Sequence, residues 1–530
     1  MKGFVRCVLL VPFICLSQPL LYPKDGGGDV SRIFWDAGSL ATVFSPGNYC
    51  RIIELDDGRL LAAAEACGGI SIASSADKGA TWSKPVCIAA SPDSIFYAVP
   101  DLIQLSDGTV LVGFNPRPVP PYSTDRLFGI RVMRSTDNGA TWEGPVFVYD
   151  ARHTFGDGCW EPSFIELESG EVQCYFADES SYISSNEQCI SVCTSLDGGR
   201  SWSDPRAVSF RAGSRDGMPV PVVLGDGKTV AVIIEDNGWP GYRNFVATTV
   251  RTSVADSWKS GPVHGDDGRR RMIFSKAPGP ESVSAAPYLR VLPWGETVAS
   301  YQGNHSPEVT DLQYFDMFVA VGDSEARKFK SITNPFHIAP GRHSIWNSVS
   351  VLDDGTVLAV GSIGMAYGHN TVKIIKGYPV RNIRAVKSCP ASGAHQNNVR
   401  LPESDVLYLG HLSGVRCPVS FSYDRSCLKI SYSVSGSDGR LGGAALHGYA
   451  LTVHLDSGKS GCRHVCIFKE GPDGLMSADI PWRSLGLNRP PYRKEIRADV
   501  ELHHNGNLID RLPDAKPDDP ETWIPLFCDR

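Results

Sequence analysis

Apolar and polar residues alternate along the chain in short runs that are typical of β-strands. One unit recurs: an apolar strand, a turn containing glycine, and a second apolar strand. Turns of this kind between two strand-like runs are typical of β-hairpins. The six copies lie 50 to 68 residues apart, with turn glycines at Gly58, Gly108, Gly170, Gly227, Gly295 and Gly355. The pattern therefore predicts six hairpins in the first 370 or so residues.

Six hairpins at this period fit a six-bladed β-propeller in which each blade is a four-stranded antiparallel sheet. We expect this propeller to span residues 30–385. The repeat stops after Gly377–Val380, and residues 391–530 contain further strand-like runs whose spacing suits a β-sandwich. The predicted fold is therefore all-β, a six-bladed propeller followed by a sandwich. Core packing is the favoured role of Trp482 and Trp523 in the sandwich, and stacking on a sugar is the alternative.

A second motif, Ser-x-Asp-x-Gly-x-Thr/Ser-Trp, occurs at Ser75–Trp82, Ser135–Trp142 and Ser195–Trp202, and a degenerate copy lies at Arg251–Trp258. Asp and Gly in this spacing form a tight turn closed by side-chain hydrogen bonds, and the Trp is suited to packing between sheets. We therefore expect a structural role for its aspartates. These are Asp77, Asp137 and Asp197.

The N-terminus predicts export. Lys2 and Arg6 precede an apolar run from Val8 to Leu16, which is too short to span a membrane and typical of a signal peptide. We expect this signal to occupy residues 1–20 and the protein to be secreted, either outside the cell or into a periplasm. No later segment is apolar over the length that a bilayer requires.

Charge and cysteine content narrow the partners. The net charge is −7 and no basic block stands out, so a nucleic-acid partner is not expected. Close cysteine pairs at Cys189–Cys193 and Cys462–Cys466 lack further ligands at the spacing of a zinc site. We interpret them as buried apolar residues or local disulfides, and we expect no metal and no cofactor. Nothing in the sequence fixes the oligomeric state.

Chemistry is expected at the ends of the strands opposite the hairpin turns, seven to nine residues from each glycine. Before the turns these positions hold Arg51, Asp101, Glu161, Met218, Tyr288 and Asn347. After the turns they hold Glu65, Asn115, Asp178, Glu235, Gln302 and Ser362. The set is unusually polar and rich in carboxylates, which glycosidic-bond cleavage requires in pairs.

Glu161, between Trp160 and Pro162, and Glu235, at the end of an apolar strand, are the predicted catalytic carboxylates. The alternative is that each forms an ion pair with an arginine such as Arg51 or Arg243. The other positions expected to contact a sugar are Arg51, Glu65, Asp101, Asp178, Trp239, Arg243, Tyr288, Tyr301, Gln302 and Asn347.

The Asp-box motifs resemble those of the sialidase-like superfamily of propellers, and the segment GNYCRIIELDDGRLLAA resembles the first blade of those enzymes. Arg51 matches the arginine that the family places in its site, although Ile53 replaces the family's proline. Sialidases bind a carboxylate with three arginines, and this chain has Glu235 where such enzymes often place the second. The WEP segment at Trp160–Pro162 and the GMP…E segment at 217–235 resemble the exo-α-1,5-L-arabinanase family. That resemblance implies a retaining mechanism with Glu161 as acid/base and Glu235 as nucleophile.

The sequence thus predicts a secreted exo-acting glycoside hydrolase that cleaves terminal sugars from a polysaccharide or glycan, with an arabinan-like neutral sugar favoured. The first alternative is an exo-sialidase on terminal acidic sugars, with Arg243, Arg290 and Arg342 as a rebuilt anion clamp. The second is a non-catalytic carbohydrate-binding propeller, since a fold alone does not define a function.

Overall fold

The computed structural model describes residues 30–528 apart from 275–278, 305–308, 310, 337, 339–340, 366–367, 382, 388–405, 410–414, 424–425, 433–434, 437–448, 458–462, 471–475, 490–494, 505–506 and 513–523. The elements of the described residues are β-strands and short 3₁₀ helices, so the all-β prediction is confirmed. The 3₁₀ helices include η1 (Phe155–Asp157), η2 (Leu312–Tyr314) and η6 (Trp482–Leu485). The predicted signal peptide lies outside the described residues.

Six four-stranded antiparallel sheets contain the six predicted hairpins. Sheet 1 comprises β2 (Asn48–Glu54), β3 (Leu60–Ala66), β4 (Gly69–Ser75) and β5 (Val86–Ala90), and sheet 2 comprises β6 (Ile95–Gln104), β7 (Val110–Pro118), β8 (Gly129–Ser135) and β9 (Glu143–Asp150). Sheet 3 comprises β10 (Cys159–Glu166), β11 (Val172–Asp178), β12 (Cys189–Ser195) and β13 (Arg206–Ser209), and sheet 4 comprises β14 (Asp216–Val223), β15 (Thr229–Asp236), β16 (Val246–Ser253) and β17 (Arg271–Met272). Sheet 5 comprises β18 (Ala285–Val291), β19 (Thr297–Gly303), β20 (Asp316–Gly322) and β21 (Lys330–Thr333), and sheet 6 comprises β22 (Arg342–Val351), β23 (Val357–Met365), β24 (Thr371–Arg381) and β1 (Val30–Phe44).

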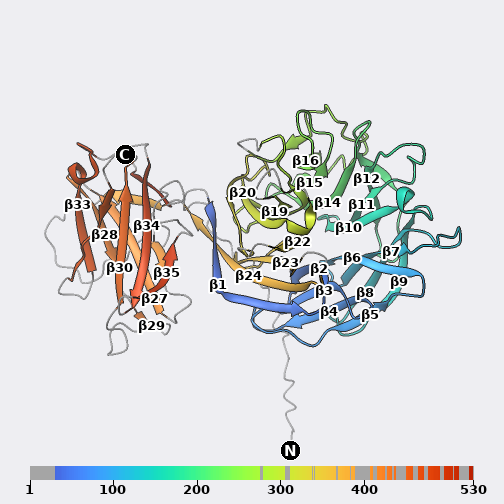
Figure 1. Cartoon of the computed structure of the whole chain (residues 1–530), viewed down its shortest axis with the longest axis horizontal. Coiled ribbons are helices and arrows are strands. Elements are labelled where there is room, and N and C mark those ends of the chain that lie inside the picture. The colour runs from blue at the N-terminus through green and yellow to red at the C-terminus, as the bar shows by residue number, and fades with distance from the viewer. Residues whose placement is uncertain are drawn as a thin grey trace, which may run out of the picture.

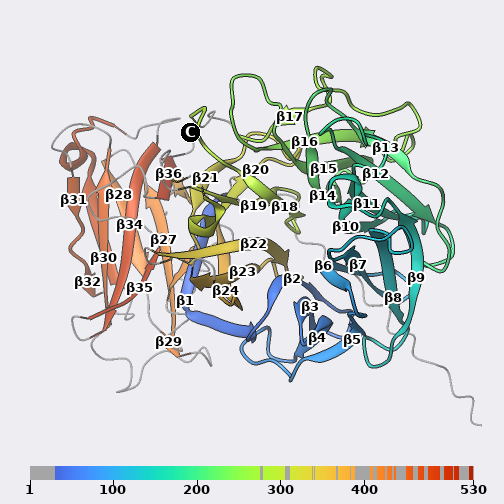
Figure 2. The same ribbon diagram turned by 45° about the vertical axis from the view of Figure 1, so that its right-hand side comes forward.

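The six sheets are arranged around a common centre (Figures 1 and 2). Their first strands contact one another in the cyclic order β2, β6, β10, β14, β18, β22, and β22 contacts β2 in turn. The first described strand, β1, pairs antiparallel with β24 and so completes the last sheet. Trp35 of β1 also donates a hydrogen bond from Nε1 to Thr333 Oγ1 over 2.9 Å, which ties the strand to sheet 5. Two distant parts of the chain therefore hold the arrangement together.

The predicted turn glycines lie between the first and second strand of each sheet. Gly58 and Gly108, for example, have φ of 80° and 84°, values that residues with a Cβ rarely adopt. Apolar side chains fill the spaces between neighbouring sheets, and the largest fully buried one is Trp258. Its Nε1 donates to the hydroxyl of Tyr175 over 2.8 Å, so the degenerate fourth Asp-box still supplies a buried tryptophan.

The Asp-boxes form the turns between the third and fourth strands. In the first of them, Asp77 accepts hydrogen bonds from the hydroxyls of Ser75 and Thr81, at 2.8 and 2.6 Å, and Trp82 Nε1 donates to the Gly79 carbonyl over 3.1 Å. These hydrogen bonds, led by that from Thr81, lower the pKa of Asp77 to about 2. The local network agrees with the structural role expected from the sequence.

The strands after β24 form a separate set with its own apolar core (Figure 1). They are β25 (Ile383–Lys387), β26 (Val406–Leu409), β27 (Val415–Tyr423), β28 (Cys427–Tyr432), β29 (Ser435–Gly436), β30 (Tyr449–Asp456), β31 (Arg463–Val465), β32 (Lys469–Glu470), β33 (Met476–Pro481), β34 (Glu495–His504), β35 (Asn507–Leu512) and β36 (Ile524–Cys528). Trp482 is buried in this core, in an edge-to-face contact with Tyr423, whereas Trp523 lies outside the described residues. The predicted domain boundaries at 385 and 391, and the assignment of a sandwich, stay predictions.

Cys189 and Cys193 are free thiols, and both are buried. Cys462 lies outside the described residues. Across the same described residues, no helix has the length and apolar character to cross a membrane.

Candidate active site

The first strand of each sheet carries a β-bulge near the end opposite the hairpin turn. The pairing with the second strand shifts there, for example between Trp160 and Ser163 in sheet 3 and between Gly217 and Val220 in sheet 4. Each bulge contains one residue with φ between 46° and 52°. These residues are Tyr49, Val99, Glu161, Met218, Ala286 and Trp346. Five of them pack in one small cluster, so the bulges converge on the centre of the ring.

Glu161 is the only carboxylate among the six bulge residues. Bulges re-aim a side chain and are common beside functional sites, and a non-glycine residue at positive φ stores strain of roughly 1–3 kcal/mol. The Glu161 carboxylate accepts no hydrogen bond from any described residue. Its ion-pair partner is Arg117 of β7, whose Nη2 lies 3.6 Å from Glu161 Oε1. The side chain of Glu161 is 19 % exposed, so a ligand can reach it.

Glu235, at the end of β15, bridges two sheets. Its Oε2 accepts a hydrogen bond from the backbone N–H of Ala286, the bulge residue of sheet 5, over 2.8 Å. No described residue donates to its Oε1. Gly217 pairs with Glu235, and a Cβ at Gly217 would lie 3.0 Å from that oxygen. The absence of a side chain at Gly217 therefore leaves room for the free oxygen of Glu235.

In three other sheets, a side chain at the end of the second strand likewise accepts a hydrogen bond from the backbone N–H of the bulge residue in the next sheet. Glu65 accepts from Val99 N over 2.8 Å, Gln302 from Trp346 N over 2.8 Å, and Ser362 from Tyr49 N over 3.0 Å. Glu65 differs from Glu235 because its other oxygen is also occupied, by Asn48 Nδ2 at 3.2 Å. Glu235 therefore combines this inter-sheet contact with an oxygen that is free for chemistry.

Burial raises the pKa of both candidate catalytic residues to about 7. For Glu161 the charges of Glu235 and Glu179 raise the pKa further, while the Arg117 guanidinium lowers it. For Glu235 the Ala286 N–H and the charge of Arg215 oppose the effect of burial. Glu161 lies at the bulge of sheet 3 and Glu235 accepts from the bulge of sheet 5, so both carboxylates lie beside the ring of bulges. Carboxyl groups that titrate near neutrality in this way are typical of catalytic acids and bases.

Two functional candidates, Arg117 and Arg215, were missed by sequence reasoning. The Arg117 guanidinium lies 4.9 Å from the Trp160 ring centroid as well as beside Glu161. Arg215 makes a bidentate contact with Glu179, at 2.6 and 3.1 Å, and Glu179 also accepts from Trp160 Nε1 over 2.6 Å. Counting seven to nine residues from the hairpin turns did not reach them, because both lie between the bulges and the loops.

Arg51, Asp101 and Tyr288 lie two residues after their bulges, in a buried layer beneath Glu161. Tyr288 donates from its hydroxyl to Asp101 Oδ1 over 3.0 Å, although the two belong to sheets 2 and 5. The Arg51 guanidinium lies 4.0 Å from the Tyr49 ring centroid and 4.8 Å from that of Tyr288. All three are at most 3 % exposed. These positions favour a role in holding the sheets together at the centre of the ring. Direct contact of the three residues with a sugar stays a prediction.

The remaining predicted positions are dispersed. Asn347 is buried and donates from Nδ2 to the Ala286 carbonyl over 3.3 Å. Asp178 accepts from the Tyr149 hydroxyl over 3.1 Å, and Tyr301 stacks on Phe318, so both face neighbouring strands. Trp239, half-buried in the loop after β15, lies with its ring 5.7 Å from the Arg211 guanidinium.

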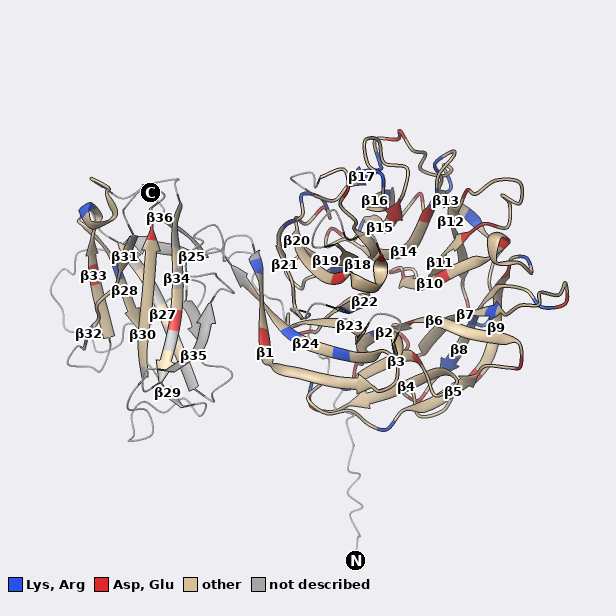
Figure 3. Cartoon of the chain, in the orientation of Figure 1, with Lys and Arg blue, Asp and Glu red and all other residues tan. Residues whose placement is uncertain are grey.

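Arg243 is largely exposed and pairs with Glu281 at 3.0 Å. The structure therefore brings together Glu161, Glu235 and Glu65 around the bulges, and it places Arg243 on the surface. Acidic and basic residues are interspersed over the six sheets (Figure 3). Within the described residues, no group of three or more His, Cys, Asp or Glu side chains is arranged to hold a metal ion.

Comparison with known proteins finds a family model that matches part of the chain. Residues 54–263 match the model of the BNR repeat-like domain. The resemblance to the sialidase-like, Asp-box superfamily that the sequence predicted is thereby confirmed for this part of the chain. No curated protein matches the chain.

Several solved structures are similar to this one. A protein of unknown function from Dyadobacter fermentans has 16% identity and a TM-score of 0.49, covering 67% of this chain and 100% of its own. The α-L-arabinofuranosidase Arb93A from Fusarium graminearum has 20% identity and a TM-score of 0.48, covering 67% and 98%. The Hadza microbial sialidase Hz136 has 14% identity and a TM-score of 0.44, covering 62% and 65%.

Proposed function

We propose that this protein is a glycoside hydrolase that cleaves terminal sugars by a two-carboxylate mechanism, with a six-bladed β-propeller as its catalytic unit. The observation that supports the proposal is that Glu161 of sheet 3 and Glu235 of sheet 4 both lie beside the ring of bulges, where burial raises their pKa values to about 7. A carboxylic acid that holds its proton near neutrality beside a second carboxylate is what glycosidic-bond cleavage needs.

In the proposed mechanism, protonated Glu161 donates its proton to the glycosidic oxygen as the bond to the leaving sugar breaks. The free oxygen of ionised Glu235 attacks the anomeric carbon and forms a glycosyl ester with the enzyme. Glu161, now ionised, removes a proton from a water molecule, which hydrolyses the ester and restores both groups. The carboxyl group of Glu161 has no hydrogen-bond partner among the described residues. This supports its role as the acid, because its proton is available to the substrate.

The charges around the pair favour a neutral sugar, such as a unit of an arabinan-like polymer. Arg215 is paired with Glu179, so its charge is already compensated. Arg243 and Arg290, two members of the anion clamp considered for an acidic sugar, are also engaged: Arg243 with Glu281, and Arg290 with the Tyr288 hydroxyl over 2.6 Å. A terminal acidic sugar would therefore meet acidic groups without a compensating cluster of arginines.

Secretion, a retaining outcome and a C-terminal β-sandwich that binds carbohydrate belong to the same proposal. A signal peptide at 1–20 would deliver the enzyme to polymeric glycans, and the resemblance to exo-arabinanases implies retention. Proton NMR of the first-formed product distinguishes retention from inversion, because the anomeric configuration is read before mutarotation.

The test compares three variants on linear arabinan oligosaccharides and on sialyl-lactose. Glu161→Gln and Glu235→Gln are expected to lose at least about a hundredfold in turnover while they still bind the sugar. Ser362→Ala is the matched control, because Ser362 makes the same inter-sheet hydrogen bond as Glu235 without a carboxylate. Wild-type turnover that survives in Glu235→Gln would refute the assignment. Sugar binding without any turnover in the wild type would instead favour a non-catalytic carbohydrate-binding protein.

A further inference from the structure

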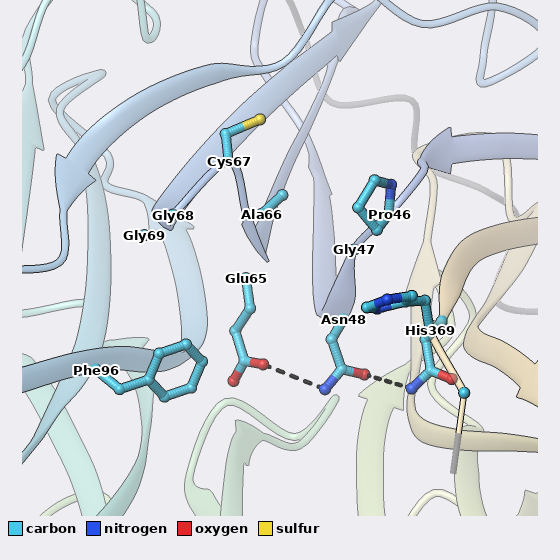
Figure 4. Close-up of a pocket in the computed structure, with 12 residues that line it drawn as sticks. Pro46, Gly47, Asn48, Glu65, Ala66, Cys67, Gly68, Gly69, Phe96 and His369 are labelled. Atoms are coloured by element: carbon cyan, nitrogen blue, oxygen red, sulfur yellow. Dashed lines mark hydrogen bonds between the residues drawn. The ribbon is translucent and has the colours of Figure 1, made fainter. Parts of the chain in front are cut away.

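A pocket of about 330 Å³ lies beside the candidate active site, at the junction of sheets 1, 2 and 6 (Figure 4). Its size falls within the range of roughly 300–1,000 Å³ that is usual for small-molecule sites. Sheet 1 contributes Asn48 and Glu65, sheet 2 contributes Phe96, and the connection between β23 and β24 contributes His369 and Asn370. None of these residues takes part in the proposed mechanism, and Glu65 alone among them was a site position predicted from the sequence.

One wall of the pocket is a chain of hydrogen bonds with a fixed direction. Asn370 Nδ2 donates to Asn48 Oδ1, and Asn48 Nδ2 donates to Glu65 Oε2, both over 3.2 Å. Behind them, buried His343 holds Asn370 Oδ1 through its Nε2 at 2.7 Å. Each amide nitrogen carries two N–H groups and uses one of them in this chain. The half-buried Asn48 and Asn370 therefore each keep one donor for a ligand.

An aromatic ring lies at one end of this row. Phe96 is 44 % exposed, and Figure 4 shows its ring beside the carboxylate of Glu65. An exposed aromatic ring at the end of a row of amide and carboxylate groups suits a sugar, whose C–H face packs on the ring while its hydroxyls exchange hydrogen bonds with the amides. The pocket thus has both kinds of contact that a monosaccharide unit needs.

The pocket borders the active site on the side of Glu161. Phe96 pairs directly with Arg117 across β6 and β7, and Arg117 is the ion-pair partner of Glu161. Glu65 accepts the N–H of Val99, the bulge residue of sheet 2, and so connects the pocket to the ring of bulges. A sugar in the pocket would lie beyond Glu161 rather than beyond Glu235.

We propose that this pocket, lined by Phe96, Asn48 and Asn370, is a subsite on the leaving-group side of the scissile bond for a sugar unit beyond the first one that departs. The proposal rests on the proposed function, because the departing chain is attached to the oxygen that Glu161 protonates and would extend past Arg117 toward the pocket. The pocket would give the enzyme a preference for longer chains.

The experiment measures affinity for linear α-1,5-arabino-oligosaccharides of two to six units by calorimetry, in a Glu235→Gln background so that the ligand is not consumed. Phe96→Ala is the test, Phe96→Trp restores an aromatic ring, and Phe147→Ala is the matched control. Phe147 is a similarly exposed phenylalanine of the same sheet, on the outer strand β9. Thermal unfolding of each variant checks that the fold is intact.

Phe96→Ala is expected to weaken binding of the longer oligosaccharides by up to about tenfold and to leave the disaccharide unchanged, while Phe96→Trp and Phe147→Ala match the parent. Loss of affinity that is independent of chain length, or no loss at all, overturns the subsite. If wild-type enzyme cleaves none of the oligosaccharides but the length-dependent loss persists, the pocket is a sugar site and the proposed hydrolase activity is wrong. If the wild type cleaves them and Phe96→Ala binds them as the control does, the hydrolase activity stands and the subsite is wrong.

Discussion

Replacing Arg117 with glutamine tests the electrostatic reasoning about Glu161. The guanidinium Nη2 lies 3.6 Å from Glu161 Oε1, at the ring centre where β7 ends. Arg117 opposes the rise in the pKa of Glu161 that burial causes. Glutamine keeps much of the length and polarity of the side chain but removes its charge. The variant should therefore raise the pKa of Glu161 further above its ordinary value.

The distance sets the size of the effect. Two unit charges about 4 Å apart interact by ~1 kcal/mol in water and ~4 kcal/mol at the effective dielectric of a protein surface. The side chains of Arg117 and Glu161 are 24 % and 19 % exposed, so the site lies between these limits. An interaction of about 1–2 kcal/mol corresponds to about one pH unit in the titration of Glu161.

The assay is the pH dependence of kcat/KM on an arabino-oligosaccharide. Glu161 must be protonated to act as an acid, so its titration sets the basic limb, and Glu235 must be ionised, so its titration sets the acidic limb. Because both groups have pKa values of about 7, the wild-type profile should be a narrow bell near neutrality. In Arg117→Gln the basic limb should move up by about one pH unit, and the acidic limb should stay in place.

Arg131→Gln is the matched control, because Arg131 of the same sheet pairs with Asp150 at 2.7 Å and is similarly exposed. Its profile should match that of the wild type. A basic limb that stays or moves down in Arg117→Gln would refute the electrostatic argument. A shift of the acidic limb alone would exchange the roles of Glu161 and Glu235.

Three further predictions follow from burial and pairing. Thermal unfolding should show stability falling as pH rises from about 4.5 through 7, since Glu161 and Glu235 bind protons more tightly when folded; each contributes on the order of 3 kcal/mol, and the Glu→Gln variants should flatten the curve. Trp258→Ala should lower the free energy of unfolding by about 3–5 kcal/mol in denaturant titrations, because the ring is fully buried. Deleting residues 30–44 should lower the melting temperature and promote association measurable by light scattering, because the edge of β24 loses its partner; an unchanged melting temperature and particle size would contradict this.

The repeat and the Asp-boxes were predictable because both depend on local rules. A turn that needs positive φ selects glycine, as at Gly58 and Gly108, and a tight turn closed by side chains selects Ser, Asp and Thr, as at Ser75–Trp82. Each rule therefore selects similar residues in every copy. The order of the strands within the chain then fixes which hairpin neighbours which, without any further information from the side chains.

The layers of the site were not predictable in the same way, because a bulge adds a residue that counting from the turn does not see. Glu161 and Met218 lie at their bulges, whereas Arg51, Asp101 and Tyr288 lie two residues further along and one layer deeper. Counting from the turn glycines treats all five positions as equivalent. It therefore combines side chains that a ligand can reach with side chains that are buried beneath them. The partners Arg117 and Arg215 were lost for the related reason that they lie beyond the bulges.

The amino-acid sequence nevertheless contains a signal for the bulges. In four of the six sheets the residue at positive φ precedes a proline: Val99, Glu161, Met218 and Ala286. A residue before proline ordinarily adopts extended backbone, so positive φ at that point costs free energy in every one of these sheets. Apolar side chains at three of the positions pack against one another and offset that cost. Glu161 has no such packing and accepts no hydrogen bond from the described residues, and its ion pair with Arg117 returns less free energy than burial of the ionised carboxylate costs. That imbalance between cost and structural return is the strongest physical reason to assign Glu161 to catalysis rather than to stability.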